Sequence, residues 1–243
     1  MEADAAAVAA VVAERLLLAC GSARPLGLAT GRTMEPVYAA LAERWAALPT
    51  KERVALAQNW CSFNLDEYVG LAASDPRSFR AFMDLHLTGP LGLDPDRLRL
   101  PDGTAADPQA EAARYSAELA DAGGVGLQLL GLGLNGHVGF NEPPCSSDVC
   151  CRCLALSPAT RQQNAGAFGG DPAAVPQRAI TLGLAEILEA EEILLVVTGA
   201  GKASILRRVL EEPPSVELPA SWLQQHRAVT VIADREAVPW AQA

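Results

Sequence analysis

Short apolar runs alternate along the chain with longer segments in which apolar residues recur at helical spacing. The runs occupy 26–29, 59–65, 98–101, 193–197 and 228–233, and a central run begins at 129. The helical patterns cover 5–20, 36–48, 76–87, 107–120, 182–189 and 219–226. Continuous apolar runs are typical of strands buried on both faces, and their alternation with helices predicts an α/β fold with a mostly parallel sheet and helices on both faces.

The central run leads into a glycine-rich stretch, LLGLGLNGHVGFNEP at 129–143. Open α/β sheets bind their ligands at the carboxyl ends of strands, and the glycines give this loop the freedom in φ to fold back. His137 is then the expected proton carrier, and Glu142 the carboxylate that orients it. The alternative is a connection whose glycines serve packing and whose histidine is an ordinary loop residue. The string NGHVGFNEP is more specific than a GxGxxG spacing alone.

Two small-residue turns each follow a predicted strand and open a predicted helix. The first contains Thr30, Gly31, Arg32 and Thr33, and the second ends in Lys202. Backbone N–H groups and hydroxyls at such a turn form a cradle for an anion, although an ordinary connection with a threonine N-cap has the same pattern. A lysine in the first turn of a helix opposes the helix dipole unless an anion binds there.

Asp66 and Glu67 follow the run at 59–65. Adjacent side chains on extended backbone point to opposite faces, so at most one of the two carboxylates faces a cleft. The other is expected to pair or to cap, and either could be a solvated turn residue.

The net charge of -10 argues against a nucleic-acid partner or an anionic membrane, because both need a broad basic face. An anionic ligand must therefore meet a local positive site. With 243 residues, 50% of them hydrophobic, the chain is expected to form a single domain over 1–243, with a candidate lid in the polar segment 144–170. It lacks an 18-residue apolar run and a basic leader, which predicts a cytoplasmic protein.

Six cysteines are spread along the chain without the pattern of a small secreted domain, so we expect reduced thiols. Cys150, Cys151 and Cys153 cluster, which could indicate metal or redox chemistry. They lack a CxxC pair and a nearby histidine, and we predict no metal site.

Taken together, these motifs resemble the hexosamine-phosphate deaminase family, the glucosamine-6-phosphate deaminases/isomerases. The resemblance runs through LGLATGRT (26–33), FNLDEYVGL (63–71), GLGLNGHVGFNEP (131–143), ITLGLAEILEAEEILLVVTGAGKA (180–203) and LPAS (218–221). It implies a modified doubly wound α/β domain. The related 6-phosphogluconolactonases share the general fold and a Gly-His pair, but FNLDEYVGL and FNEP favour the deaminase branch.

The resemblance also implies roles for individual residues. Asp66 is similar to the base that moves the C2 proton of the opened sugar, His137 to the group that assists ring opening, and Glu142 to the carboxylate that orients this histidine. The residues that resemble the family's phosphate site are Thr30, Gly31, Thr33 and Lys202, with Arg32 in the same cradle.

Three features depart from the family pattern. Asn135 stands where some relatives carry aspartate, which leaves one acid beside the histidine instead of two. Gly166 stands where the family often has a phosphate-binding arginine, so either Arg161 substitutes or the phosphate is held less tightly. The chain stops soon after Asp234, and allosteric control by an N-acetylated sugar phosphate is therefore not expected.

The resulting hypothesis is an enzyme that converts a small-molecule amino-sugar phosphate, glucosamine 6-phosphate, and water to fructose 6-phosphate and ammonia. It needs no cofactor, and a homo-oligomer is compatible with it. The stretch TRQQNAG (160–166) leaves galactosamine 6-phosphate open as the substrate. An alternative of another class is a catalytically silent regulator that binds a sugar phosphate.

Overall fold

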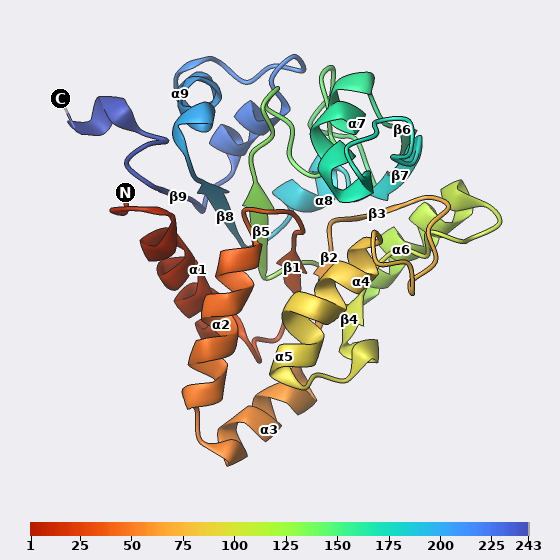
Figure 1. Ribbon diagram of the computed structural model, residues 1–243, viewed down its shortest axis with the longest axis vertical. Helices are drawn as coiled ribbons and strands as arrows, with labels where there is room; N and C mark the ends of the chain where they lie inside the picture. The colour runs from red at the N-terminus through yellow and green to blue at the C-terminus, as the bar shows by residue number, and fades with distance from the viewer. Residues whose placement is uncertain (243) are drawn as a thin grey trace.

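The computed structural model describes residues 1–242, and a six-stranded parallel sheet in the order β4-β2-β1-β5-β8-β9 forms its centre (Figure 1). The strands are β1 (Leu26–Leu28), β2 (Ser62–Asn64), β4 (Leu98–Arg99), β5 (Leu127–Gly131), β8 (Glu192–Val197) and β9 (Val229–Ala233). This is the doubly wound order, in which the direction of winding reverses between β1 and β5. The prediction of a doubly wound, mostly parallel sheet is confirmed. The loops after β1 and β5 are where such a fold binds its ligand.

Helices cover both faces of this sheet (Figure 1). In front lie α1 (Ala5–Ala19), α2 (Glu35–Ala47), α4 (Phe79–Met83) and α5 (Gly89–Leu91), and behind lie α6 (Pro108–Asp121) and α8 (Leu184–Leu188). The start of α6 illustrates the local cause, since the Asp107 side chain accepts from the backbone N–H groups of Gln109 and Ala110, and Pro108 fixes the first turn. None of the helices in residues 1–242 has the length and apolar character to cross a membrane.

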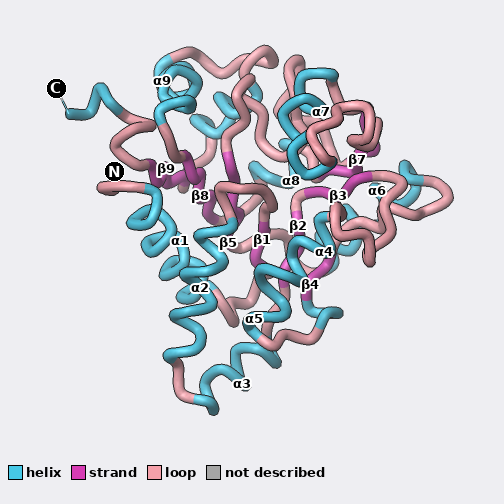
Figure 2. Tube along the Cα trace, in the orientation of Figure 1, coloured by secondary structure: helices cyan, strands magenta, loops and turns pink. Residues whose placement is uncertain are grey.

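A second, antiparallel sheet in the order β3-β7-β6 was not predicted. Its strands are β3 (Asp66–Tyr68), β6 (Arg152–Ala155) and β7 (Arg178–Thr181), and Figure 2 shows them at the side of the parallel sheet. The segment 144–170, a candidate lid from the sequence, holds β6, α7 (Pro158–Asn164) and the 3-10 helix Ala165–Phe168, and its role as a lid stays a prediction. The side chains of β6 are all partly exposed, so they lack the apolar alternation that marks a strand.

Three predicted elements also differ from the structure. The run at 59–65 is not one strand, because Asn59 ends helix α3 (Thr50–Asn59) and β2 begins at Ser62. Helix α3 has no buried residue and therefore no apolar stripe to reveal it. The predicted helix at 76–87 becomes α4 followed by the π-helical turn Asp84–Thr88. The last predicted helix, at 219–226, is the 3-10 helix Pro219–Gln225, and α9 (Ala203–Glu211) follows the Lys202 turn.

Candidate active site

A cavity of about 680 Å³ opens at the carboxyl ends of β1, β2 and β5, where its wall also includes β3 and the 163–167 segment. This size is within the range of small-molecule sites. The predicted site residues that line it are Thr30, Gly31, Arg32, Thr33, Asp66, His137 and Lys202. Asn135 and Glu142 are not among the lining residues and lie behind His137.

Asp66 lies at the point where the chain passes from the parallel sheet into the antiparallel one. Leu65 still bonds to β1 through Leu28, whereas Asp66 pairs with Thr181 of β7. Its side chain is 5% exposed and approaches Gly139, where an added Cβ would lie 3.5 Å from Oδ2. Burial, and to a lesser degree the nearby Glu67 carboxyl, raises the pKa of Asp66 to about 8. Once ionised, this carboxylate is a much stronger base than an exposed aspartate.

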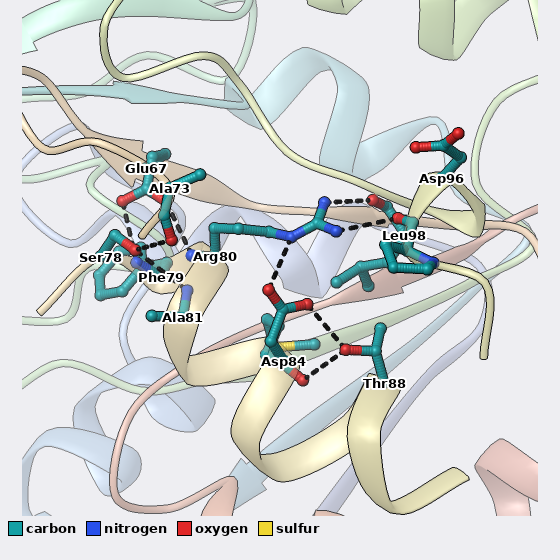
Figure 3. Close-up of polar contacts among 12 residues, drawn as sticks. Glu67, Ala73, Ser78, Phe79, Arg80, Ala81, Asp84, Thr88, Asp96 and Leu98 are labelled. Atoms are coloured by element: carbon teal, nitrogen blue, oxygen red, sulfur yellow. Dashed lines mark hydrogen bonds and ion pairs between the residues drawn. The ribbon is translucent and has the colours of Figure 1, made fainter. Parts of the chain in front are cut away.

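Glu67 is not among the residues that line the cavity. Its side chain binds the start of α4 (Figure 3). Its carboxylate accepts from the backbone N–H groups of Tyr68 at 2.8 Å, Phe79 at 2.9 Å and Arg80 at 2.8 Å. Arg80 in turn donates to the carbonyl of Leu98 at the start of β4. The two adjacent carboxylates therefore do point to opposite sides, one into the cavity and one into the fold.

His137 is oriented by Asn135, which corrects the expectation that Glu142 does this directly. The His137 Nδ1 atom lies 2.5 Å from the Asn135 Oδ1 atom, and the Asn135 amide nitrogen donates to Glu142 at 3.4 Å. Because Glu142 takes the NH₂ group, the amide oxygen faces the ring, so that Nδ1 carries the proton and Nε2 is free to accept one. The ring also packs on Gly133, where an added Cβ would lie 2.3 Å from Cε1.

The burial of the His137 ring favours a neutral imidazole. Burial lowers the pKa of His137 to about 4, with Glu142 opposing the shift and Lys202 adding to it. Burial acts to raise the pKa of Glu142, but hydrogen bonds from Thr160 and Ser157 outweigh it and leave that pKa below its usual value. Glu142 is therefore a carboxylate held by Ser157 and Thr160, and Asn135 lies between it and the histidine.

Two cations mark the other end of the cavity. Arg32 follows β1 in the predicted cradle, and Lys202 follows β8 and donates through Nζ to the Leu132 carbonyl at 2.6 Å. Burial and the neighbouring Arg32 charge lower the pKa of Lys202. Two like charges this close favour an anion between them. Gly31 has a φ of 102°, and an added Cβ there meets nothing within 4 Å, so this backbone faces open space.

Arg161 does not substitute for the arginine that Gly166 lacks. Its guanidinium donates to the carbonyls of Pro172, Ala173 and Val175 and so braces the loop after α7. Sequence reasoning also missed the lining residues Arg77, Phe79 and Phe82, which no local motif marks because α4 brings them to the cavity. It singled out the stretch 160–166 but gave no role to the lining residues Gln163 and Asn164 within it.

The cysteine cluster lies apart from this cavity. Among residues 1–242, no three His, Cys, Asp or Glu side chains gather in an arrangement suited to a metal ion, and all six cysteines are free thiols. Burial raises the pKa of Cys151 to about 12, so this thiol is a packing group at neutral pH.

A second cavity, of about 510 Å³, lies at the amino ends of β1 and β2, opposite the first one. Its arginines, Arg24 and Arg99, are paired with Glu191 and Glu118. The side chains predicted from the motifs gather in the first cavity instead.

Known proteins share both the sequence and the architecture. The family described as "Glucosamine-6-phosphate isomerases/6-phosphogluconolactonase" matches residues 1–232. A glucosamine-6-phosphate deaminase of Rhodopirellula baltica is 45% identical over 87% of this chain and 82% of its own. Glucosamine-6-phosphate deaminase 2 of Bacillus subtilis is 41% identical, over 87% of this chain and 84% of its own.

Solved structures agree with this grouping. A monomeric glucosamine-6-phosphate deaminase aligns with a TM-score of 0.88 at 36% identity, over 97% of this chain and 96% of that one. The 6-phosphogluconolactonase of Leishmania guyanensis, at 22% identity, shares the fold with a TM-score of 0.74 over 98% and 96% of the two chains. The chain belongs to the glucosamine-6-phosphate isomerase/6-phosphogluconolactonase family, a family of enzymes.

Proposed function

We propose that this protein is a glucosamine-6-phosphate deaminase, which converts glucosamine 6-phosphate and water to fructose 6-phosphate and ammonia. The observation that carries the proposal is that one cavity holds a buried carboxyl group, a neutral histidine and two cations. An amino-sugar phosphate presents the matching groups, namely an acidic C–H beside a carbonyl, a ring to be opened and a phosphate. The names of the relatives support glucosamine as the amino sugar.

Asp66 is the base in this proposal. In the open-chain sugar the C1 aldehyde acidifies the C2 proton, and the carboxylate takes that proton and returns it to C1. The C2 amine becomes an imine, which water hydrolyses to the ketone and ammonia. A pKa near 8 leaves Asp66 mostly protonated in the empty cavity at pH 7. The substrate's C2 ammonium group favours the ionised carboxylate, so that binding prepares the base.

His137 opens the ring. Its Nε2 atom accepts the proton of the C1 hydroxyl and passes it to the ring oxygen, which breaks the bond from C1 to that oxygen. The Nδ1 contact with Asn135 holds the tautomer that this transfer needs. A histidine with a pKa of about 4 stays neutral, and so able to accept, over the whole physiological range.

Arg32, Lys202 and the Thr30 to Thr33 turn bind the phosphate. Neither cation is committed to a carboxylate among the described residues, and the turn adds hydroxyl and backbone donors. The reaction requires no cofactor, because the substrate's own carbonyl and amine accept the electrons.

The decisive experiment measures ammonia release from glucosamine 6-phosphate, galactosamine 6-phosphate and unphosphorylated glucosamine, with 6-phosphogluconolactone hydrolysis in parallel. We expect at least a tenfold higher kcat/KM for the gluco form, since one unpaired hydroxyl costs about 1 to 3 kcal/mol. A tenfold preference for the galacto form would transfer the assignment to that epimer. Binding without ammonia release from any substrate would indicate the silent regulator. Cytoplasmic location and a homo-oligomer stay predictions, and light scattering tests the latter.

A further inference from the structure

A third arginine, Arg77, lines the same cavity from the segment that leads into α4. Asp75 holds its guanidinium side-on, accepting from Nε at 2.8 Å and from Nη2 at 2.6 Å. The Cζ atom lies 5.5 Å from the centre of the Phe168 ring, so the guanidinium packs on the last residue of the 3-10 helix Ala165–Phe168. A fixed guanidinium loses little freedom when it binds an anion.

Asp75 leaves one edge of the guanidinium available. The Nη1 amino group of Arg77 has no protein acceptor within residues 1–242, and the side chain is 44% exposed. Because the Asp75 charge offsets the arginine charge, the pair acts mainly through directed N–H donors rather than through a broad positive field. Such donors suit the oxygens of a phosphate.

Gly166 leaves an open space on the cavity wall that Arg77 also lines. It lines the same cavity two residues before Phe168, and an added Cβ there meets nothing within 4 Å. Its φ is not positive, so a larger side chain would fit without backbone strain. Arg161, the arginine of neighbouring α7, points to the Val175 carbonyl instead.

We propose that Arg77 binds the substrate's phosphate and reaches, from the wall beside α4, the same anion that a long side chain at position 166 would reach. The inference rests on the proposed function for the identity of the substrate. It makes the phosphate site a three-cation site built from Arg32, Lys202 and Arg77, with the third cation supplied by a segment that no phosphate-binding motif marks.

The test compares Arg77→Gln with Arg207→Gln, a matched control in which an exposed arginine paired with Glu211 on α9 is changed in the same way. Direct titration with inorganic phosphate and KM for glucosamine 6-phosphate are measured for both. We expect Arg77→Gln to lower the affinity for phosphate and to raise the KM by roughly tenfold each, the scale of one charge-assisted contact, with kcat changed much less. Arg207→Gln should match the unmodified protein.

A second variant tests the shared position. Gly166→Arg in the Arg77→Gln background should restore most of the lost phosphate affinity. The proposal would be overturned if Arg77→Gln bound phosphate as tightly as Arg207→Gln does. It would also be overturned if the double variant bound phosphate no more tightly than Arg77→Gln. If the unmodified protein binds phosphate but releases no ammonia, the proposed function fails, and the phosphate titrations still decide the role of Arg77.

Discussion

The two ends of the cavity are built in opposite ways. At one end Asp66 is buried and His137 is half-buried, and burial shifts the pKa of each so that its neutral form is favoured. At the other end Arg32 is exposed and Lys202 is half-buried, on turns that follow β1 and β8. The end with Asp66 and His137 is built by the antiparallel sheet and the glycine-rich loop. The end with Arg32 and Lys202 is built at the carboxyl ends of strands of the parallel sheet.

This difference follows from the tasks of the two ends. Proton transfer needs groups whose basicity has been changed by removing water, and that costs stability. Phosphate binding needs charge and donors at an accessible edge, where the anion arrives still hydrated. Substitutions at the two ends should therefore separate catalysis from binding.

Asp66→Asn should produce the largest effect. It keeps the shape of the side chain and removes the base, so turnover should fall on the order of 10²- to 10⁴-fold while sugar-phosphate binding is retained. Exchange of the C2 proton with deuterated solvent measures the step directly. Asp96→Asn, an exposed aspartate, is the control. Undiminished exchange in Asp66→Asn would remove Asp66 from this role.

The same substitution should make the protein more stable than the unmodified one, by a margin that grows as pH rises. The pKa of Asp66 is raised from 3.8 to about 8 in the folded state, so the folded state binds more protons than the unfolded state between these values. The free energy of unfolding therefore falls as pH rises through this window, by up to a few kcal/mol. Asp66→Asn removes that loss, and its advantage in urea unfolding should be larger at pH 8.5 than at pH 5. A pH-independent difference would contradict the raised pKa.

Lys202→Ala should weaken binding at the other end without changing the chemistry. Loss of a charge-assisted contact of roughly 1.5 to 3 kcal/mol should weaken the binding of phosphorylated sugars far more than the binding of their unphosphorylated counterparts. Lys51→Ala on the exposed helix α3 is the matched control. Equal weakening of both kinds of ligand would place the phosphate elsewhere.

Glu67→Gln should give the smallest effect, which should appear both in stability and in the rate of C2 exchange. Glutamine retains one acceptor oxygen but turns an NH₂ group toward the N–H donors at the start of α4, at a cost of about 1 to 3 kcal/mol in unfolding free energy. We also expect a lower rate of C2 exchange, because Glu67 adjoins Asp66. Glu111→Gln removes a similar buried carboxylate from α6 and should lower stability alone. Identical kinetics in the two variants would make Glu67 purely structural.

The parallel sheet was predictable because its strands are short runs of apolar residues buried on both faces. The run at 193–197 is β8 almost to the residue, and the turns after β1 and β8 lie on the cavity as expected. The second sheet could not be predicted in the same way. Its three- and four-residue strands are held by pairing between distant segments, such as Glu67 with Ile180, and carry no periodicity of their own.

The site was predictable where function is concentrated in one short stretch, and less so where it depends on packing. Asp66 and His137 belong to distinctive motifs and do line the cavity. The amide of Asn135 between His137 and Glu142 could not be inferred, because sequence spacing does not say which of two polar neighbours contacts the ring. Arg77 lies on the cavity because Glu67 fixes the start of α4, a long-range contact.

The helix α7 has a further consequence through Glu142. Ser157, which caps this helix, and Thr160 within it hold the carboxylate that accepts from the NH₂ group of Asn135. The resulting orientation of the amide sets which nitrogen of His137 carries the proton. A shift of α7 that released Glu142 would free the amide to rotate and would exchange a hydrogen-bond acceptor for a donor beside the ring. The position of α7 therefore determines the tautomer of His137, and with it whether Nε2 can accept a proton.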